Sequence, residues 1–294
     1  MVGCGFLSMP LAMLILLLAA LAGGYWLGRR PRREGEQRTG FGITPDEEPE
    51  TASPATAVAS APAGIAPVSS NLYDFETLAS LAVSGCWQLK LECNAPENYC
   101  RVTAESSLWQ EIKVETLPAG LSIRYTGKHR PTLPMTIEIR TKGQPSQLKG
   151  RGANTMMVEH VHGNQFSCKV SDGGRLLLPE AELDEFKLKL SGSARAEIGG
   201  EFTRADLDVS GSSSAKCSGS IRRADLAVSG ASRLELASAV RADLEVSGAS
   251  RVKIDVSERL EGDVSGASTL KYSGEVKKPS LRVSGSSRAE RAEK

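Results

Sequence analysis

The fold is decided by three segments: RADLDVSG at 204–211, RADLAVSG at 223–230 and RADLEVSG at 241–248. Each segment places apolar residues four and two positions before its closing glycine, and this alternation is typical of a short strand with one buried face. After the glycine the alternation resumes at the fourth and sixth positions. Each unit therefore contains two short strands joined at a glycine turn.

The same glycine recurs along the C-terminal half of the chain, at Gly192, Gly211, Gly230, Gly248, Gly266 and Gly285. It returns about every 19 residues, and so short and regular a period predicts a solenoid. Only small residues fit a tight corner between stacked coils, so we assign these glycines a structural role.

The apolar positions predict the cross-section of the solenoid. Four inward positions in each of six coils give 24 places, of which only Gly262 and Arg291 are not apolar. A further apolar residue at Phe202, Ile221, Val240 or Val276 predicts a third wall and a triangular section. Two degenerate coils precede these, one around Gly152 and one with Asp172 in the place of glycine. The predicted fold is all-β, a parallel β-helix over 148–291 whose coils each take up about 18–20 residues.

The repeat is lost between 86 and 147, where we predict an insertion. LSIRYT at 121–126 and MTIEIRT at 135–141 alternate around a turn, which predicts an antiparallel flap capping the N-terminal end of the stack. At the other end, the charged segment SSRAERAEK at 286–294 is interpreted as a polar lid.

The N-terminal segment predicts a membrane anchor. Residues 6–28 are almost wholly apolar and long enough for a transmembrane helix, although Ala20 and Ala22 also fit a cleaved signal peptide. Residues 29–71 are interpreted as a disordered linker rich in Pro and Ala. The arginines just after the anchor favour a cytoplasmic domain and the spacer favours one outside, so the topology stays open.

The cysteines also bear on the compartment. Cys93 and Cys100 flank a short loop and form either a disulfide, in an oxidising compartment, or two free thiols. Cys86, Cys168 and Cys217 are interpreted as small buried apolar side chains.

The polar residues give little indication of chemistry. His160 and His162 alternate and are weak candidates for metal ligands, because a third ligand is not evident. The serines two positions after each glycine have no histidine within the repeat to act as a base, so no catalytic residue and no cofactor are predicted. Stacked columns of Arg and Asp, beginning at Arg204 and Asp206, are interpreted as solvated charge ladders.

Lys plus Arg total 36 against 35 Asp plus Glu, a balance that does not favour nucleic acid as a partner.

YDFETLASLAVSGCWQLKLE at 73–92 and LRVSGSSRAE at 281–290, together with the alternating insertion, resemble a bacterial family called the putative autotransporter adhesin head GIN domain. The resemblance covers about 72–291 and includes the motif formed by Phe75, Leu81, Val83, Ser84 and Gly85. It implies a right-handed β-helix and an envelope location, and it implies no catalytic residues.

Three functions follow as hypotheses. The first is a non-catalytic cell-envelope binding or adhesion-like module, tethered to the membrane through residues 6–28 and binding an envelope polysaccharide or protein. The second is a cytoplasm-facing scaffold that self-assembles through the ends of the β-helix. The third, a polysaccharide-acting enzyme, rests on fold analogy alone.

Overall fold

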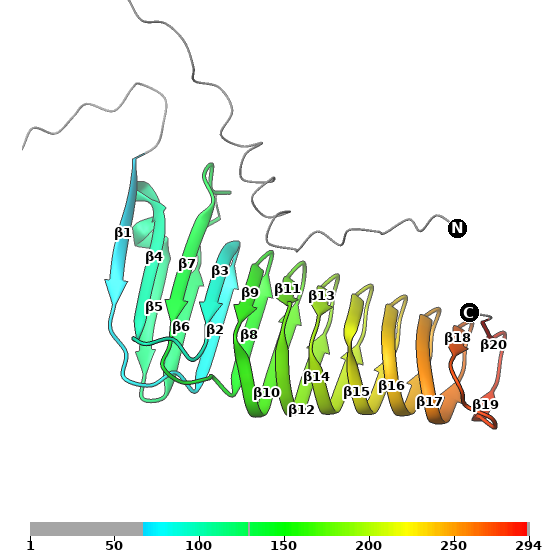
Figure 1. Cartoon of the computed structure of the whole chain (residues 1–294). Helices are drawn as coiled ribbons and strands as arrows, with labels where there is room; N and C mark the ends of the chain where they lie inside the picture. Colours follow the sequence, from blue (N-terminus) through cyan, green and yellow to red (C-terminus); the bar gives the residue numbers. More distant parts are fainter. Residues whose placement is uncertain (1–66, 129, 293–294) are drawn as a thin grey trace, which may run out of the picture. The chain divides into compact units, whose positions relative to one another are not determined.

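Parallel pairing of successive coils builds most of the structure, a computed structural model that describes residues 67–128 and 130–292. The coils stack in order from β8 to β20 (Figure 1). The anchor predicted for 6–28 and nearly all of the linker predicted for 29–71 lie outside the described residues. Within the described residues, no helix is both long and apolar enough to cross a membrane. The all-β class is confirmed, since the one helix described is a short 3-10 turn, η1 (Ser106–Glu111).

The first wall of the β-helix is formed by strands that pair in parallel with their neighbours in the stack. In spatial order the wall begins with three whole strands, β6 (Gly120–Tyr125), β2 (Ser80–Gly85) and β8 (Gln147–Gly152). It continues with the later parts of six longer strands, β10 (Val161–Ser171), β12 (Ala181–Leu190), β14 (Glu201–Val209), β15 (Ser214–Val228), β16 (Arg233–Val246) and β17 (Arg251–Val264). It ends with β19 (Ser280–Val283).

The second wall is also parallel throughout. Its strands in spatial order are β7 (Met135–Arg140), β3 (Trp87–Glu92), β9 (Thr155–Glu159), β11 (Arg175–Leu178), β13 (Arg195–Ile198), the first residues of β15, β16 and β17, then β18 (Thr269–Ser273) and β20 (Arg288–Arg291). A short third wall, formed by the start of β10, β12 and β14 and the middle of β15 and β16, closes the section.

The flap prediction is wrong in its pairing. Residues 121–126 and 135–141 do form strands, β6 and β7, but these do not pair with each other. They pair in parallel with β2 and β3, so the insertion supplies a further coil of the stack. The coil of β2 and β3 therefore lies between this coil and the coil of β8 and β9.

An antiparallel cap covers the outermost coil and is formed by two strands of the insertion together with β1. β4 (Tyr99–Glu105) pairs with β7, β1 (Val68–Tyr73) pairs with β4, and β5 (Ile112–Leu117) pairs with β6. β1 begins inside the segment predicted as linker. The expectation that the N-terminal end of the stack is covered is therefore met by β1, β4 and β5.

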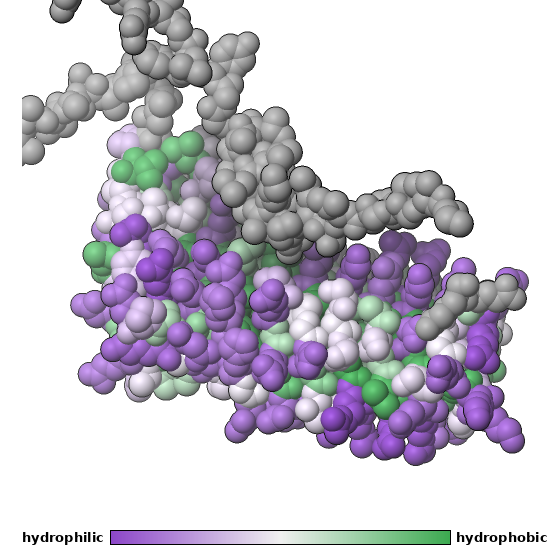
Figure 2. All heavy atoms as spheres, in the orientation of Figure 1, coloured by the Kyte–Doolittle hydropathy of each residue, from purple (hydrophilic) through white to green (hydrophobic). Residues whose placement is uncertain are grey.

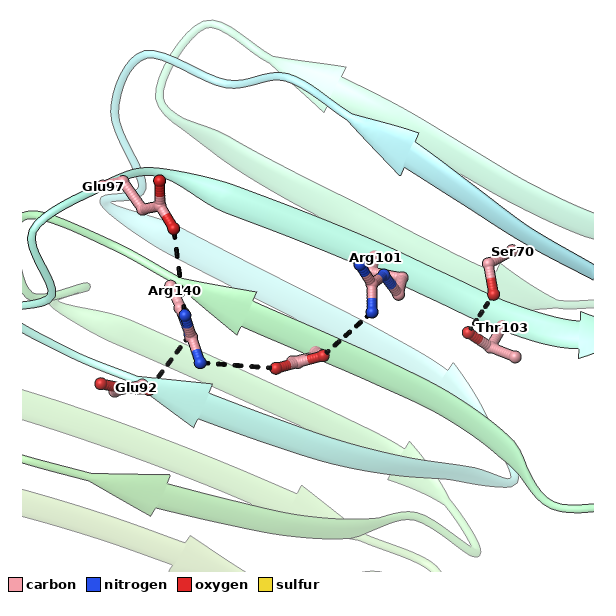
Figure 3. Close-up of polar contacts among 7 residues, drawn as sticks. Ser70, Glu92, Glu97, Arg101, Thr103 and Arg140 are labelled. Atoms are coloured by element: carbon pink, nitrogen blue, oxygen red, sulfur yellow. Dashed lines mark hydrogen bonds and ion pairs between the residues drawn. The ribbon is translucent and has the colours of Figure 1, made fainter.

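An ion-pair network ties the cap to the second wall (Figure 3). The Arg140 guanidinium of β7 lies 3.3 Å from the Glu92 carboxylate of β3 and 3.9 Å from those of Glu97 and Glu138. Arg101 of β4 lies 4.0 Å from Glu138. These contacts cross three neighbouring strands on their solvent side.

One apolar core runs through the stack. Of the 24 inward positions predicted from the alternation, 18 are buried, among them Leu207, Leu244 and Val252, and the buried apolar residues form one cluster. The six that are not buried all belong to the last two coils: Gly262, Tyr272, Leu281, Val283, Ala289 and Arg291. Phe166, Phe186 and Phe202 add a row of rings, with centroids 6.4 and 5.2 Å apart. Because the buried residues of this cluster all lie between residues 75 and 276, we expect residues 67–294 to fold by themselves.

The third wall differs in one position from the prediction. Ala239, which is 2% exposed, takes the inward place assigned to Val240, which is half-buried. The register of β15 against β16 shifts between Cys217 and Ser220, and this shift aligns Ile221 with Ala239. Ala239 lies nine positions before Gly248, just as Ile221 lies nine positions before Gly230, so the error came from choosing the larger side chain one position later.

The corner glycines have the conformation that their place requires. Gly192, Gly211, Gly230, Gly248, Gly266 and Gly285 all have φ between 71° and 81°. A Cβ atom on any of them would lie under 3.0 Å from backbone atoms of the coil before it. Asp172, the residue predicted in the place of a glycine, has φ 66°. The backbone of every one of these corners is therefore left-handed.

Candidate functional site

A groove follows the corner between the third and first walls. Two adjoining hollows of about 930 and 640 Å³ share Thr203, Arg222 and Val240, so they form one channel along the stack. These corner residues have no partner in the strand register, because β14, β15 and β16 bend there from one wall to the next. The groove arises wherever successive coils bend at the same place.

The groove is polar, and its charge changes along its length. Arginines line the part nearer the C-terminus, together with fewer carboxylates: Arg204, Arg222, Arg223, Arg241 and Arg259, with Asp243, Glu258 and Glu261. The part nearer the cap is acidic, with Glu182, Asp184 and Glu201. Charged and polar side chains likewise dominate the face of the coils shown in Figure 2.

Most of these arginines are held by carboxylates. Arg204 lies 2.7 Å from Asp225 of the next coil, and Arg223 shares that carboxylate at 3.6 Å. Arg259 lies 2.6 Å from Glu261, and this hydrogen bond lowers the pKa of the Glu261 carboxyl. Within the described residues Arg222 has no ion-pair partner. The predicted charge ladders are therefore present, but the pairs cross between coils as well as within them.

Three serines of the row donate their hydroxyls to backbone carbonyls. Ser232, Ser250 and Ser268 are buried and each donates its hydroxyl at 3.2 Å to the corner glycine carbonyl of the coil before it. Ser213 is also buried, but its hydroxyl has no hydrogen-bond partner. These contacts hold coils together and present no activated nucleophile.

The two histidines are not on one strand. β9 ends at Glu159, His160 follows with φ 58°, and His162 lies in β10 with its Nδ1 3.9 Å from the Glu182 carboxylate. In the part of the chain that the structure describes, no group of three or more His, Cys, Asp or Glu side chains is placed to hold a metal. The turn at His160 separates the two rings that the sequence had suggested as a pair.

Cys93 and Cys100 are free, buried thiols, and burial raises the pKa of each to about 12. Leu91 of β3 and Cys100 of β4 both pair with Ile139, on opposite edges of β7. Two strand spacings amount to about 9.6 Å, which exceeds the Cα separation of about 7 Å that a disulfide allows. Of the two alternatives that the sequence left open, the structure has the two free thiols, on strands separated by β7.

Two buried polar residues escaped prediction. Asn154 accepts a hydrogen bond from the Trp87 amide at 3.0 Å and donates to the Arg151 carbonyl at 2.7 Å, which fixes the corner between β8 and β9. Glu105 accepts from the Thr132 hydroxyl and the Leu133 amide, and these bonds lower the pKa of its carboxyl. In the sequence their one distinguishing feature is a polar residue at a corner or at the end of a strand.

The family model described as putative auto-transporter adhesin, head GIN domain, matches residues 77–276. The chain belongs to this family. A comparison with curated proteins found no match for this GIN-domain chain.

Solved structures share the fold. A putative adhesin from Parabacteroides distasonis is 18% identical with a TM-score of 0.70, and the match covers 77% of this chain and 97% of that one. A putative adhesin from Parabacteroides merdae is 14% identical with a TM-score of 0.69, covering 77% and 96%. A protein from P. distasonis described as a putative lipid binding protein is 14% identical with a TM-score of 0.67, covering 77% and 97%. At these identities the likeness concerns the fold alone.

Proposed function

We propose that the chain is a non-catalytic, adhesion-like binding module of the cell envelope, and that it holds an extended polar ligand in the corner groove. The observation that carries this proposal is the continuity of the groove across successive coils. A groove that repeats at a strand spacing of about 4.8 Å suits a linear polymer better than a compact small molecule.

The side chains of the groove favour an envelope polysaccharide as that polymer. Arginine paired with carboxylate offers planar donors beside acceptors, which matches the adjacent hydroxyls of a sugar. Phe202 borders the groove, but its ring is buried in the core and offers no stacking surface. Recognition by hydrogen bonds along the ladder is therefore the proposed mode.

Attachment and location complete the proposal. The predicted anchor at 6–28 and linker at 29–71 would hold the domain outside the cytoplasm at a membrane, and membership of a family named for adhesins supports that side. We propose binding without cleavage because the carboxylates of the first wall follow one another coil by coil, and arginines engage Asp225, Glu261 and Asp263 among them. A glycosidase instead places two carboxylates about one scissile bond.

The test is binding of residues 67–294 to a panel of immobilised neutral and acidic polysaccharides. We expect at least one to bind, and we expect Arg222→Ser combined with Arg241→Ser to weaken that binding. Arg233→Ser combined with Arg251→Ser, on the second wall, is the matched control and should bind as before. Binding that only the control pair reduces, or release of sugar fragments from the bound polymer, would contradict the proposal.

A second candidate, a scaffold that assembles end to end, is favoured by the C-terminal coil. Among the described residues, β19 and β20 each pair along one edge only, and Val283 is 46% exposed. Arg291 argues against such assembly. It occupies the last predicted inward position and donates to the Gly274 carbonyl at 2.7 Å, and a charge at an inward position hinders pairing of edge strands. Concentration-dependent oligomers in sedimentation of residues 67–294 would favour the scaffold.

A further inference from the structure

The second wall of the last coils carries cations that are not compensated. Ten outward positions from the first residues of β15 to β20 hold six cations, Lys216, Arg233, Arg251, Lys253, Lys271 and Arg288. The other four are Ser214, Glu235, Thr269 and Glu290, so the formal charge of the ten is six minus two, or +4. Asp255, one outward position further along β17, accepts a hydrogen bond from the Ser273 hydroxyl and lowers the charge of this side to +3. We call these ten residues the basic face.

These six cations differ from the arginines of the groove in their contacts. All six are exposed, and within the described residues none of them has an ion pair or a side-chain hydrogen bond. In the groove, by contrast, Arg204 and Arg259 lie 2.7 and 2.6 Å from carboxylates. The positive charge of the basic face is therefore available to a partner.

The basic face is a flat, two-dimensional array. Its side chains stand in two columns, one beginning at Ser214 and the other at Lys216, over five strands in register. With strands about 4.8 Å apart, the array is about 19 Å long. The hollows on it are small, about 310 and 200 Å³. Within the described residues, none of the exposed large apolar side chains lies on this face.

We propose that the basic face lies on an anionic lipid bilayer, with headgroup phosphates and carboxylates between its cations. A linear polyanion could follow only the column of Arg233 and Arg251, because in the column of Lys216 it would meet the carboxylates of Glu235 and Glu290. Lipid headgroups diffuse laterally and can gather around the cations instead. Because apolar side chains are not offered for insertion, the attraction is electrostatic and depends on salt.

The orientation that results is compatible with the proposed ligand groove. In a triangular section the corner between the third and first walls lies opposite the second wall. A domain resting on the basic face would therefore turn the corner groove away from the bilayer. The predicted anchor at 6–28 would add a second point of attachment and raise the local concentration of the domain at the same membrane.

The test is flotation of residues 67–294 with vesicles of phosphatidylcholine, alone or with a third of the lipid replaced by phosphatidylserine. This fragment has its own core, and circular dichroism checks its fold in every variant. We expect binding to the anionic vesicles only, and loss of binding when salt is raised to about 0.5 M. Arg251→Ser, Lys253→Ser and Lys271→Ser together should weaken it by about a hundredfold, or about fivefold for each cation.

The matched control removes the same charge from the first wall. Arg204→Ser, Arg223→Ser and Arg259→Ser together should leave vesicle binding within about threefold of the unmodified fragment. The proposal is overturned if the folded fragment ignores anionic vesicles, or if both triple variants lose binding equally. Binding to soluble polygalacturonate without binding to vesicles would also overturn it, in favour of a polyanion. Polysaccharide binding through the groove is measured separately and stands or falls without this result.

Discussion

The corner glycines offer the sharpest test of how the coils stack, and Gly248→Ala is the most direct perturbation. Gly248 lies in the middle of the regular coils with φ 78°. A Cβ atom there would lie 2.5 Å from the Gly230 carbonyl oxygen, where ordinary contacts begin at 3.4 Å. The backbone of one coil must therefore move by about 0.9 Å relative to the other, since 3.4 minus 2.5 is 0.9.

The expected cost has two parts. A left-handed backbone costs a residue with a Cβ atom about 1–2 kcal/mol. The Gly230 carbonyl also accepts the Ala249 amide at 2.7 Å and the Ser250 hydroxyl at 3.2 Å. Displacing that carbonyl weakens both bonds, each of which contributes about 1 kcal/mol. We therefore expect Gly248→Ala to destabilise the domain by about 2–4 kcal/mol.

Urea unfolding of residues 67–294, followed by circular dichroism, measures this loss. Gly173→Ala is the control, because the turn at Gly173 is not left-handed and a Cβ there would meet no atom within 4 Å. The control should stay within about 0.5 kcal/mol of the unmodified domain. Equal stability of the two variants would refute the steric argument.

Three other predictions concern buried polar groups. Ser250→Ala should lower the free energy of unfolding in urea by about 1 kcal/mol. Ser213→Ala should leave it unchanged or raise it, because the Ser213 hydroxyl has no hydrogen-bond partner. An equal loss of stability in both variants would contradict this. Hydrogen bonds lower the pKa of the Glu105 carboxyl in the folded state. The stability that the ionised carboxyl contributes is therefore present above its unfolded pKa and is lost as pH falls through its folded pKa. The stability lost in Glu105→Gln should therefore shrink below about pH 4, and a loss independent of pH would count against it. Of the five cysteines in residues 67–294, only Cys86 is not buried. Ellman's reagent at neutral pH should therefore react with at most one thiol before unfolding and with five after it. Reaction with only three thiols after unfolding would indicate a disulfide.

The regular coils could be predicted because stacking repeats one environment many times. Leu207, Leu226 and Leu244 occupy the same inward place in successive coils, and each is buried. The same repetition identified Asp172 as a substitute for glycine, and its backbone is left-handed like that of the corner glycines. Alternation and period together were sufficient for this part of the fold.

The order of the first coils could not be predicted, because alternation identifies a strand and says nothing of its neighbour. β6 and β7 had the pattern of a hairpin, yet each pairs with a strand that is distant in the sequence, as in Leu81 with Leu121 and Leu89 with Ile137. The groove was missed for a related reason. Its corner residues, such as Arg222, lie outside the strand alternation and come together only when coils stack.

The central claim, a binding module displayed outside the cytoplasm, is tested most directly by protease treatment of intact cells. With antibody against residues 67–294 as the probe, we expect cleavage in the linker at 29–71 to release the domain while a cytoplasmic marker protein stays intact. Retention of the full chain until the cells are lysed would contradict the claim and favour the inward-facing scaffold.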